Sequence, residues 1–136
     1  MLKPSTFFLV LIIFSACKTK TSDHEANEQL ITFHSHTIMG MDQLVEAGDE
    51  NYQKIDSKEF NLKTDTIQFT NNKIYVSYLA IVNGCGQYAG DIEIRKDSLF
   101  LKLVDISGIG CTHERCDRLV YTIRNPENKQ YKIIKR

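Results

Sequence analysis

Apolar and polar residues alternate along most of the chain from position 66 onward, and this period of two limits the possible folds more than any other feature of the sequence. Successive side chains of a β-strand point to opposite faces of a sheet, so the alternation is typical of strands that are buried on one side. The pattern predicts three hairpins, at residues 66–82, 91–104 and 118–134, with turns at residues 71–72, 96–97 and 125–128.

Each predicted hairpin has a register that brings the apolar residues of its two strands onto one face. The two asparagines of the first turn suit a type I′ turn, because asparagine tolerates a positive φ. The predicted cross-strand pairs are Phe69 with Ile74, Ile67 with Val76, Ile94 with Leu99, Ile92 with Leu101, Ile123 with Tyr131, and Tyr121 with Ile133. Such apolar faces must cover one another, so the predicted fold class is all-β: a small antiparallel β-sandwich or flattened barrel built from hairpins.

A further strand is predicted before the hairpins, at residues 30–38. Its alternation places Ile31 and Phe33 on one face and His34 and His36 on the other. We expect the isoleucine and the phenylalanine to face the core and the two histidines to face solvent.

Between this strand and the first hairpin the sequence predicts one short helix. It covers residues 42–47 and ends at Gly48, with Leu44 and Val45 as its packing residues. Residues 49–63 show no clear periodicity, so no element is predicted there.

The N-terminus has the organisation of a secretory signal sequence. A positive residue, Lys3, precedes an unbroken apolar run at residues 7–14, and the small residues Ser15 and Ala16 follow. A helix of this length spans about 12 Å, whereas roughly 20 residues are needed to cross a bilayer. The residues just before Cys17 resemble the lipobox of bacterial lipoproteins.

This resemblance implies that Cys17 is the first residue of the mature chain and carries acyl chains, in which each buried CH₂ adds about 0.8 kcal/mol of membrane affinity. Residues 1–16 are then the signal peptide, residues 17–29 the lipidated cysteine and a flexible tether, and residues 30–136 the β-rich domain. Lys18 resembles the second mature residue of lipoproteins that are sorted to the outer membrane of Gram-negative bacteria. With its NGCG and CTHERC segments, the whole chain resembles small lipoproteins of the Bacteroidetes group.

Composition narrows the possible partners. The chain has 17 Lys and Arg residues against 17 Asp and Glu residues, so it lacks the basic excess that binds phosphate backbones, and we expect no nucleic-acid partner. Thiol catalysis needs an exposed cysteine of low pKa and an oriented base, and Cys111 with His113 close by in the sequence shows neither. The main expectation is a non-enzymatic binding or structural module that binds a protein, a glycan or a small ligand. The glycine-rich residues 82–90 fit a ligand loop or a tight crossover between hairpins.

Three cysteines follow Cys17, and they permit at most one intramolecular disulfide. An oxidising compartment favours such a bridge. Cys111 and Cys116 flank a short loop that can bring their sulfurs together, so we predict the bridge there and a free Cys85. A bridge from Cys85 to either of the others, or three reduced thiols, is the alternative.

Periplasmic metal binding is the alternative function. Thiolates and imidazoles suit zinc or monovalent copper, and thioethers suit copper. The residues concerned are a Cys₃His set of Cys85, Cys111, Cys116 and His113, and a second set of His34, His36, Met39 and Met41. Exposed histidines and packing methionines explain the same residues without a metal, so no cofactor or metal site is assigned.

Overall fold

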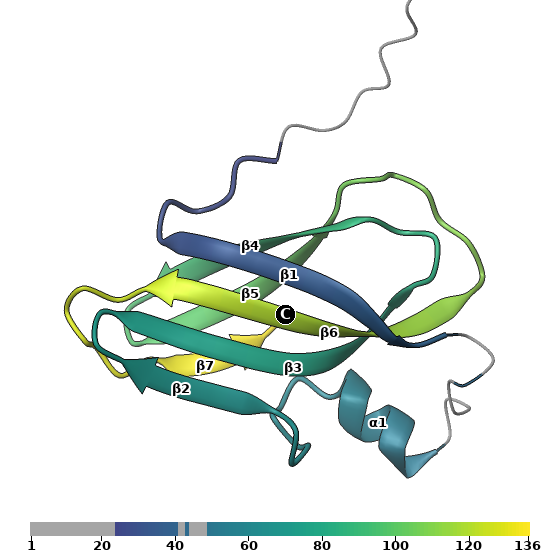
Figure 1. The fold of residues 1–136 in the computed structure, drawn as a ribbon, viewed down its shortest axis with the longest axis horizontal. Helices are drawn as coiled ribbons and strands as arrows, with labels where there is room; N and C mark the ends of the chain where they lie inside the picture. Colours follow the sequence, from purple (N-terminus) through teal and green to yellow (C-terminus); the bar gives the residue numbers. More distant parts are fainter. Residues whose placement is uncertain (1–23, 41–42, 44–48) are drawn as a thin grey trace, which may run out of the picture.

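The fold is taken from a computed structural model, which describes residues 24–40, 43 and 49–136. Two β-sheets pack face to face, with strand orders β1-β6-β3-β2 and β4-β5-β7 (Figure 1). The strands are β1 (Leu30–Met39), β2 (Thr66–Thr70), β3 (Lys73–Asn83), β4 (Tyr88–Arg95), β5 (Ser98–Asp105), β6 (Glu114–Arg124) and β7 (Lys132–Lys135). The predicted all-β sandwich is therefore confirmed, and within the described residues its two sheets do not close into a barrel.

The first two predicted hairpins are confirmed in their register. Phe69 lies opposite Ile74 between β2 and β3, and Ile94 lies opposite Leu99 between β4 and β5. The first turn differs in type, because only its second asparagine, Asn72, has a positive φ, of 64°. A type I′ turn requires a positive φ at both central residues.

The predicted third hairpin is wrong. β7 runs parallel to β5 in the other sheet, so Ile133 lies opposite Leu99 instead of Tyr121. The turn after β6 is held by the buried Asn125 side chain, which accepts from the N–H of Lys129 and donates to its carbonyl, both at 3.0 Å. From this turn the chain crosses to the second sheet. Ile133 still packs against the core, so the alternation predicted its burial but not its partner.

Two bulges in β1 change which of its side chains face the core. Ile31 and Ile38 each fall at a register shift in the pairing with β6, and they are 40% and 43% exposed. The prediction that Ile31 faces the core is therefore wrong, because the extra residue of a bulge reverses the alternation locally. Phe33 does face inward, and its ring centroid lies 4.9 Å from that of Tyr121.

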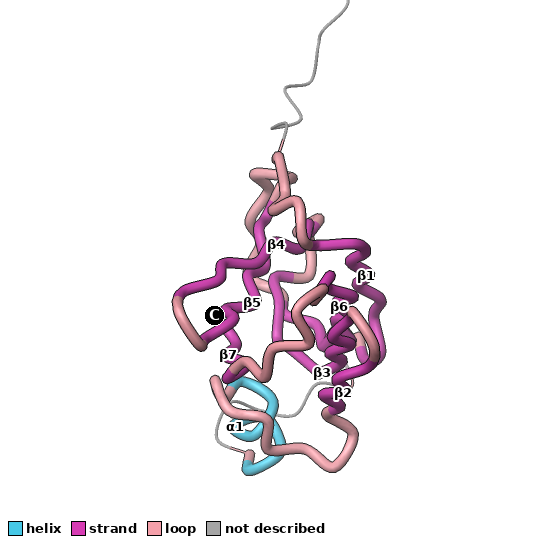
Figure 2. The backbone as a smooth tube through the Cα atoms, turned by 90° about the vertical axis from the view of Figure 1, so that its left-hand side faces the viewer, coloured by secondary structure: helices cyan, strands magenta, loops and turns pink. Residues whose placement is uncertain are grey.

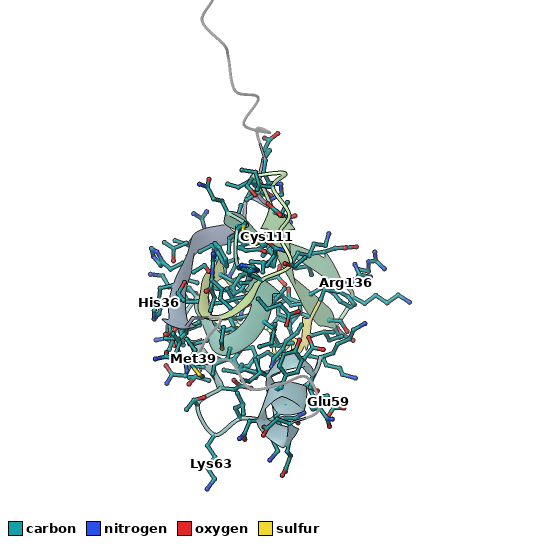
Figure 3. The ribbon with its side chains drawn as sticks, turned by 90° about the vertical axis from the view of Figure 1, so that its right-hand side faces the viewer. His36, Met39, Glu59, Lys63, Cys111 and Arg136 are labelled. Atoms are coloured by element: carbon teal, nitrogen blue, oxygen red, sulfur yellow. A yellow bond between two sulfur atoms is a disulfide. The ribbon has the colours of Figure 1, made fainter. Side chains whose placement is uncertain are left out.

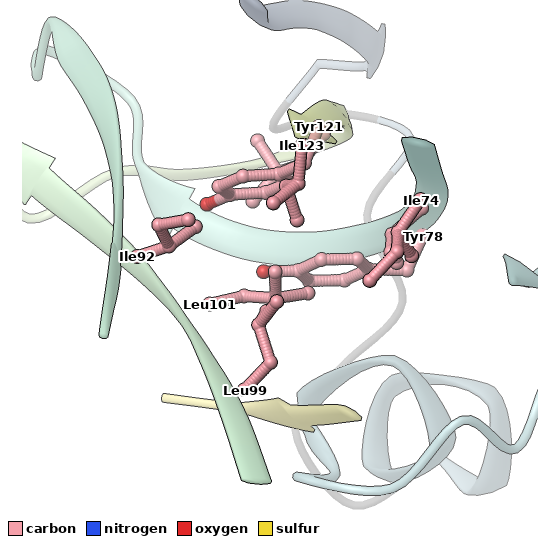
Figure 4. Close-up of a cluster of buried hydrophobic side chains, with 9 residues drawn as sticks. Ile74, Tyr78, Ile92, Leu99, Leu101, Tyr121 and Ile123 are labelled. Atoms are coloured by element: carbon pink, nitrogen blue, oxygen red, sulfur yellow. The ribbon is translucent and has the colours of Figure 1, made fainter. Parts of the chain in front are cut away.

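The main core lies between the two sheets (Figure 4). The Tyr78 and Tyr121 rings stack with centroids 6.1 Å apart, and the Tyr121 hydroxyl donates to the Lys102 carbonyl of β5 at 2.8 Å. Burial raises the pKa of Tyr78 to about 12, so the Tyr78 hydroxyl stays protonated over the physiological range of pH. The buried residues of this core are Ile74, Val76, Tyr78, Ile92, Leu99, Leu101, Leu119, Tyr121 and Ile123.

One helix, α1 (Glu50–Asp56), lies at an end of the sandwich (Figure 2). It forms in the region where the sequence predicted no element. Its start is capped by Asp49, whose side chain accepts a hydrogen bond from the N–H of Asn51 at 2.7 Å. Ile55 is its buried residue and packs with Leu79 of β3 and Cys116 of β6 in a second, smaller cluster, which we call the cluster under α1.

Some sequence predictions fall outside the described residues. These include Cys17, the tether as far as residue 23, and the helix predicted at residues 42–47 apart from Gln43. In the part of the chain that is described, no helix is long and apolar enough to cross a membrane.

Candidate functional site

The disulfide joins Cys85 to Cys111, and Cys116 is a free, buried cysteine. The predicted bridge between Cys111 and Cys116 is therefore wrong. Cys116 lies within β6 opposite Ile81 and is fully buried in the cluster under α1, so its side chain is fixed by packing. Cys111 lies in the loop before β6, where it meets the loop between β3 and β4.

Asn83, the last residue of β3, holds these two loops together. Its side-chain oxygen accepts from the N–H of Cys85 at 3.0 Å and from that of Cys111 at 3.3 Å. Its side-chain nitrogen donates to the Cys111 carbonyl. The loop after β3 is accordingly a tight crossover fixed by a disulfide and an asparagine, which is one of the two roles expected of the glycine-rich segment.

An ion pair between a partly exposed arginine and a buried aspartate supports the same loops from β6. Arg115 donates to both carboxylate oxygens of Asp117, at 2.9 and 3.1 Å, and also to the carbonyls of Gly84 and Gly86. Asp117 is 1% exposed and accepts a further hydrogen bond from the Ser35 hydroxyl at 2.8 Å. Burial would raise the pKa of Asp117, but the hydrogen bonds from Arg115 and Ser35 outweigh it and lower this pKa. Because both oxygens are satisfied, the pair is structural.

The expected metal ligands are not brought together. Cys85 and Cys111 form the disulfide, and burial raises the pKa of the Cys116 thiol, which disfavours a thiolate. His34 and His36 are exposed on β1, as predicted, whereas Met39 packs in the cluster under α1. Met41 lies outside the described residues. Across residues 24–40, 43 and 49–136, no group of three or more His, Cys, Asp and Glu side chains is placed to hold a metal ion.

A cavity of about 240 Å³ opens between the two sheets, beside α1 and the end of β7, and we call it the end cavity. Its walls are mostly apolar and come from β3, β5, β6 and α1. The apolar residues of these walls are Ile55, Tyr78, Leu79, Ala80, Ile81, Leu103 and Leu119. The polar residues, Asp56, Ser57, Lys58, Lys135 and Arg136, come from the end of α1, the segment after it and the end of β7.

Lys135 is the unusual residue of the end cavity, because its side chain is only 7% exposed. Its Nζ lies 3.4 Å from a carboxylate oxygen of Asp65 and faces the rings of Phe60 and Tyr78, at 4.7 and 4.9 Å. Burial lowers the pKa of Lys135, although the nearby Asp65 carboxylate opposes this. The buried ammonium therefore has one long ion pair and two aromatic contacts in place of close hydrogen bonds.

Two further cations line the cavity, and only one of them has a partner close by. Arg136 donates to Glu93 at 3.1 Å and lies over the Phe100 ring, 4.8 Å from its centroid. Lys58, just after α1, is exposed and forms no salt bridge in the described part of the chain. Figure 3 shows Arg136 on the same side of the molecule as the segment that carries Glu59.

Comparisons with models of protein families, with curated proteins and with solved structures found no match for the chain. The fold and the site define a two-sheet β-sandwich whose loops at one end are joined by a disulfide, and which has an apolar cavity lined in part by a buried lysine. Sequence reasoning missed Lys135 and Asp65, which are 70 residues apart and carry no motif. Residues 131–135 contain two lysines, Lys132 and Lys135, and nothing in the sequence indicates that the second one is buried.

Proposed function

We propose that this chain is a lipid-anchored protein of the bacterial cell envelope, and that its β-sandwich binds a small ligand in the end cavity without catalysing a reaction. The observation that carries the binding role is the buried Lys135 amine at an apolar cavity. Ligand sites are typically concave and apolar, with few polar groups that fix the orientation of the ligand.

The anchoring role is supported by the sequence. Ser15 and Ala16 precede Cys17 after an apolar run, as in a lipobox, and Lys18 fits the outer membrane of a Gram-negative bacterium. The disulfide between Cys85 and Cys111 fits an oxidising compartment outside the cytoplasm.

The position of the cavity fits such an anchor. The described chain enters β1 at Leu30, and α1 lies near the other end of this strand (Figure 1). β1 has ten residues and is therefore about 33 Å long. An anchor at Cys17 would hold the first end of β1 near the membrane and leave the end cavity open to the surrounding solution.

Labelling of the full chain with an alkyne fatty-acid analogue in a Gram-negative host tests the anchor. The wild-type chain is expected to incorporate the label and to sediment with the outer membrane, whereas Cys17→Ser should do neither. Cys116→Ser, which changes a buried cysteine of the domain, is the matched control and should label normally. Label that persists in Cys17→Ser contradicts the anchoring role.

Calorimetry of the lipidated full chain in phosphatidylcholine vesicles tests the binding role. Hexan-1-ol is a suitable probe because it is small and largely apolar, and empty vesicles correct for its partition into lipid. Binding is expected for the wild-type chain and not for Ala80→Phe, which fills the cavity. Equal heats for the two chains contradict a small-ligand site at this place.

A further inference from the structure

We propose that the ligand of the end cavity is a small amphipathic carboxylate, with its apolar part against β3 and β6 and its carboxylate hydrogen-bonded to Lys135. This inference rests on the proposed binding role and names the chemical class of the ligand.

The cations at the cavity offer hydrogen-bond donors to an anion. The side chains that line the cavity include three cations, Lys58, Lys135 and Arg136, against one carboxylate, Asp56. Asp65 beside Lys135 and Glu93 beside Arg136 bring the nearby carboxylates to three, so the charges balance and the preference for an anion rests on hydrogen-bond donors and not on net charge.

Lys135 has unused capacity to donate hydrogen bonds. An ammonium group has three N–H donors, and its one carboxylate neighbour is at 3.4 Å, longer than the 2.7–2.9 Å of a strong charge-assisted bond. The rings of Phe60 and Tyr78 stabilise its charge but offer no lone pair. A ligand carboxylate would supply the close acceptor that this buried amine lacks.

The rest of the cavity favours an apolar tail of limited size. Ala80, Leu103 and Leu119 contribute walls without polar side-chain atoms. The volume of about 240 Å³ is below the roughly 300–1,000 Å³ that is common for sites of drug-sized ligands. A short aliphatic or aromatic carboxylic acid fits these limits better than a sugar, whose hydroxyl groups would lie against the apolar walls unpaired.

Three six-carbon probes that differ in charge separate the contribution of the ligand's charge to binding from that of its apolar contacts. Hexanoate, hexan-1-ol and hexylammonium are titrated into the full chain in phosphatidylcholine vesicles, with empty vesicles as the blank. Hexanoate is expected to bind at least about tenfold more tightly than hexan-1-ol, and hexylammonium more weakly than both.

Substitutions then test the role of the amine. Lys135→Met keeps the apolar stem and removes the charge, so it should weaken hexanoate binding at least about tenfold and leave hexan-1-ol within about twofold. Because this change leaves the Asp65 carboxylate buried without its counter-charge, the double variant Lys135→Met/Asp65→Asn provides the same test in a neutral background. Circular dichroism of each variant verifies the fold.

Two exposed lysines form a matched control pair. Lys58→Gln removes a cation at the cavity and should weaken hexanoate binding by about two- to threefold, as expected for an exposed charge. Lys73→Gln removes an equally exposed cation at the far end of β3 and should leave the affinity unchanged.

The outcomes distinguish a failure of the carboxylate assignment from a failure of the proposed binding role on which it rests. Equal affinities for hexanoate and hexan-1-ol overturn the carboxylate assignment and leave a small-ligand site in place. Hexanoate binding that survives in Lys135→Met/Asp65→Asn also overturns it. If none of the three probes binds the wild-type chain, the binding role and the carboxylate assignment both fall.

Discussion

Asp117 illustrates how a single buried carboxylate links the two sides of this fold. It sits on β6, takes hydrogen bonds from Arg115 and from Ser35 of β1, and fixes the guanidinium that holds the loop after β3. Its pKa is lowered in the folded chain, where the hydrogen bonds outweigh the effect of burial. A group with a lowered folded pKa stabilises the fold above its unfolded pKa of about 3.9, and this stabilisation is lost as the pH falls through the folded pKa.

Replacement of Asp117 by asparagine should therefore lower the free energy of unfolding at pH 7 by about 1–3 kcal/mol, because a charged pair is broken beside a partly exposed arginine. At a pH below the unfolded pKa of about 3.9 the difference from wild type should shrink, because the carboxylate is increasingly protonated there. Urea unfolding at both pH values measures this. Asp97→Asn, which changes an exposed ion pair, should cost no more than about 1 kcal/mol. An Asp117→Asn deficit that is equal at both pH values contradicts the argument.

Gly90 shows that a glycine in a strand can serve a neighbouring side chain. A Cβ at this position would lie 2.3 Å from ring atoms of Phe33, so glycine is needed for the ring to pack across the end of β4. The sequence placed Gly90 at the end of a glycine-rich segment and left its role open. Its purpose depends on a residue 57 positions earlier (90 minus 33), which local patterns do not indicate.

We expect Gly90→Ala to destabilise the chain by about 1–3 kcal/mol, as overpacking of a core does. Gly110→Ala is the matched control, because a Cβ there meets nothing within 4 Å, and it should change stability by less than about 0.5 kcal/mol. The second-site change Phe33→Leu should recover part of the loss in Gly90→Ala. Thermal unfolding of the four chains provides the measurement, and equal stability of the two alanine variants would count against a clash with Phe33.

At the scale of elements, the sequence correctly predicted the strand pairings that depend on residues close together in the chain. β2 with β3 and β4 with β5 pair across two-residue turns, so the alternation and the turn residues together determine their register. The same reasoning paired β7 with β6, but β7 pairs with β5. Ile133 packs against the core in the observed pairing and would do so in the predicted one, so the alternation alone could not distinguish the two. The bulges at Ile31 and Ile38 leave no signal in an alternating pattern.

The disulfide was mispredicted for the same reason. A short separation between Cys111 and Cys116 favoured a local bridge, but Cys116 is committed to a paired and buried position on β6. The observed bridge spans 26 residues and joins the loops at the ends of β3 and β5. The chain-entropy model then assigns it about 3.5 kcal/mol of stabilisation, more than a bridge across a loop of four residues would provide.

Removal of the bridge in Cys85→Ser/Cys111→Ser should accordingly lower the free energy of unfolding by about 2–4 kcal/mol. Thiol counting on denatured, unreduced protein should detect one thiol in the domain, and peptide mapping should assign it to Cys116. Cys116→Ala tests packing alone in the cluster under α1 and leaves the bridge intact. A count of three thiols, or a mapped bridge between Cys111 and Cys116, contradicts the observed pairing.

At the scale of the whole molecule, the two ends of the sandwich have different surroundings. The first end carries residues 24–29 and the turns after β2 and β6, and the other carries α1, the disulfide and the end cavity (Figure 1). The site depends on this arrangement, because its residues come from four strands and from α1. The sequence predicted the sandwich but not the cavity, since a cavity is produced by the way separate elements meet.

This difference between the two ends of the sandwich predicts how the domain is oriented at the membrane if Cys17 is the anchor. The roughly ten residues between Cys17 and Asn27, whose N–H donates to Asp91, have a root-mean-square reach of roughly 17 Å, less than the roughly 33 Å length of β1. A dye on Glu127→Cys, in the turn after β6, should therefore transfer more energy to acceptor lipids than a dye on Lys63→Cys, in the loop after α1. Both positions are exposed, and Cys116 is too buried to label in the folded chain. The same pair carrying Cys17→Ser should show little transfer at either site. Equal transfer in the anchored chains would mean that the domain lies flat or tumbles freely, so that the end cavity does not face away from the membrane.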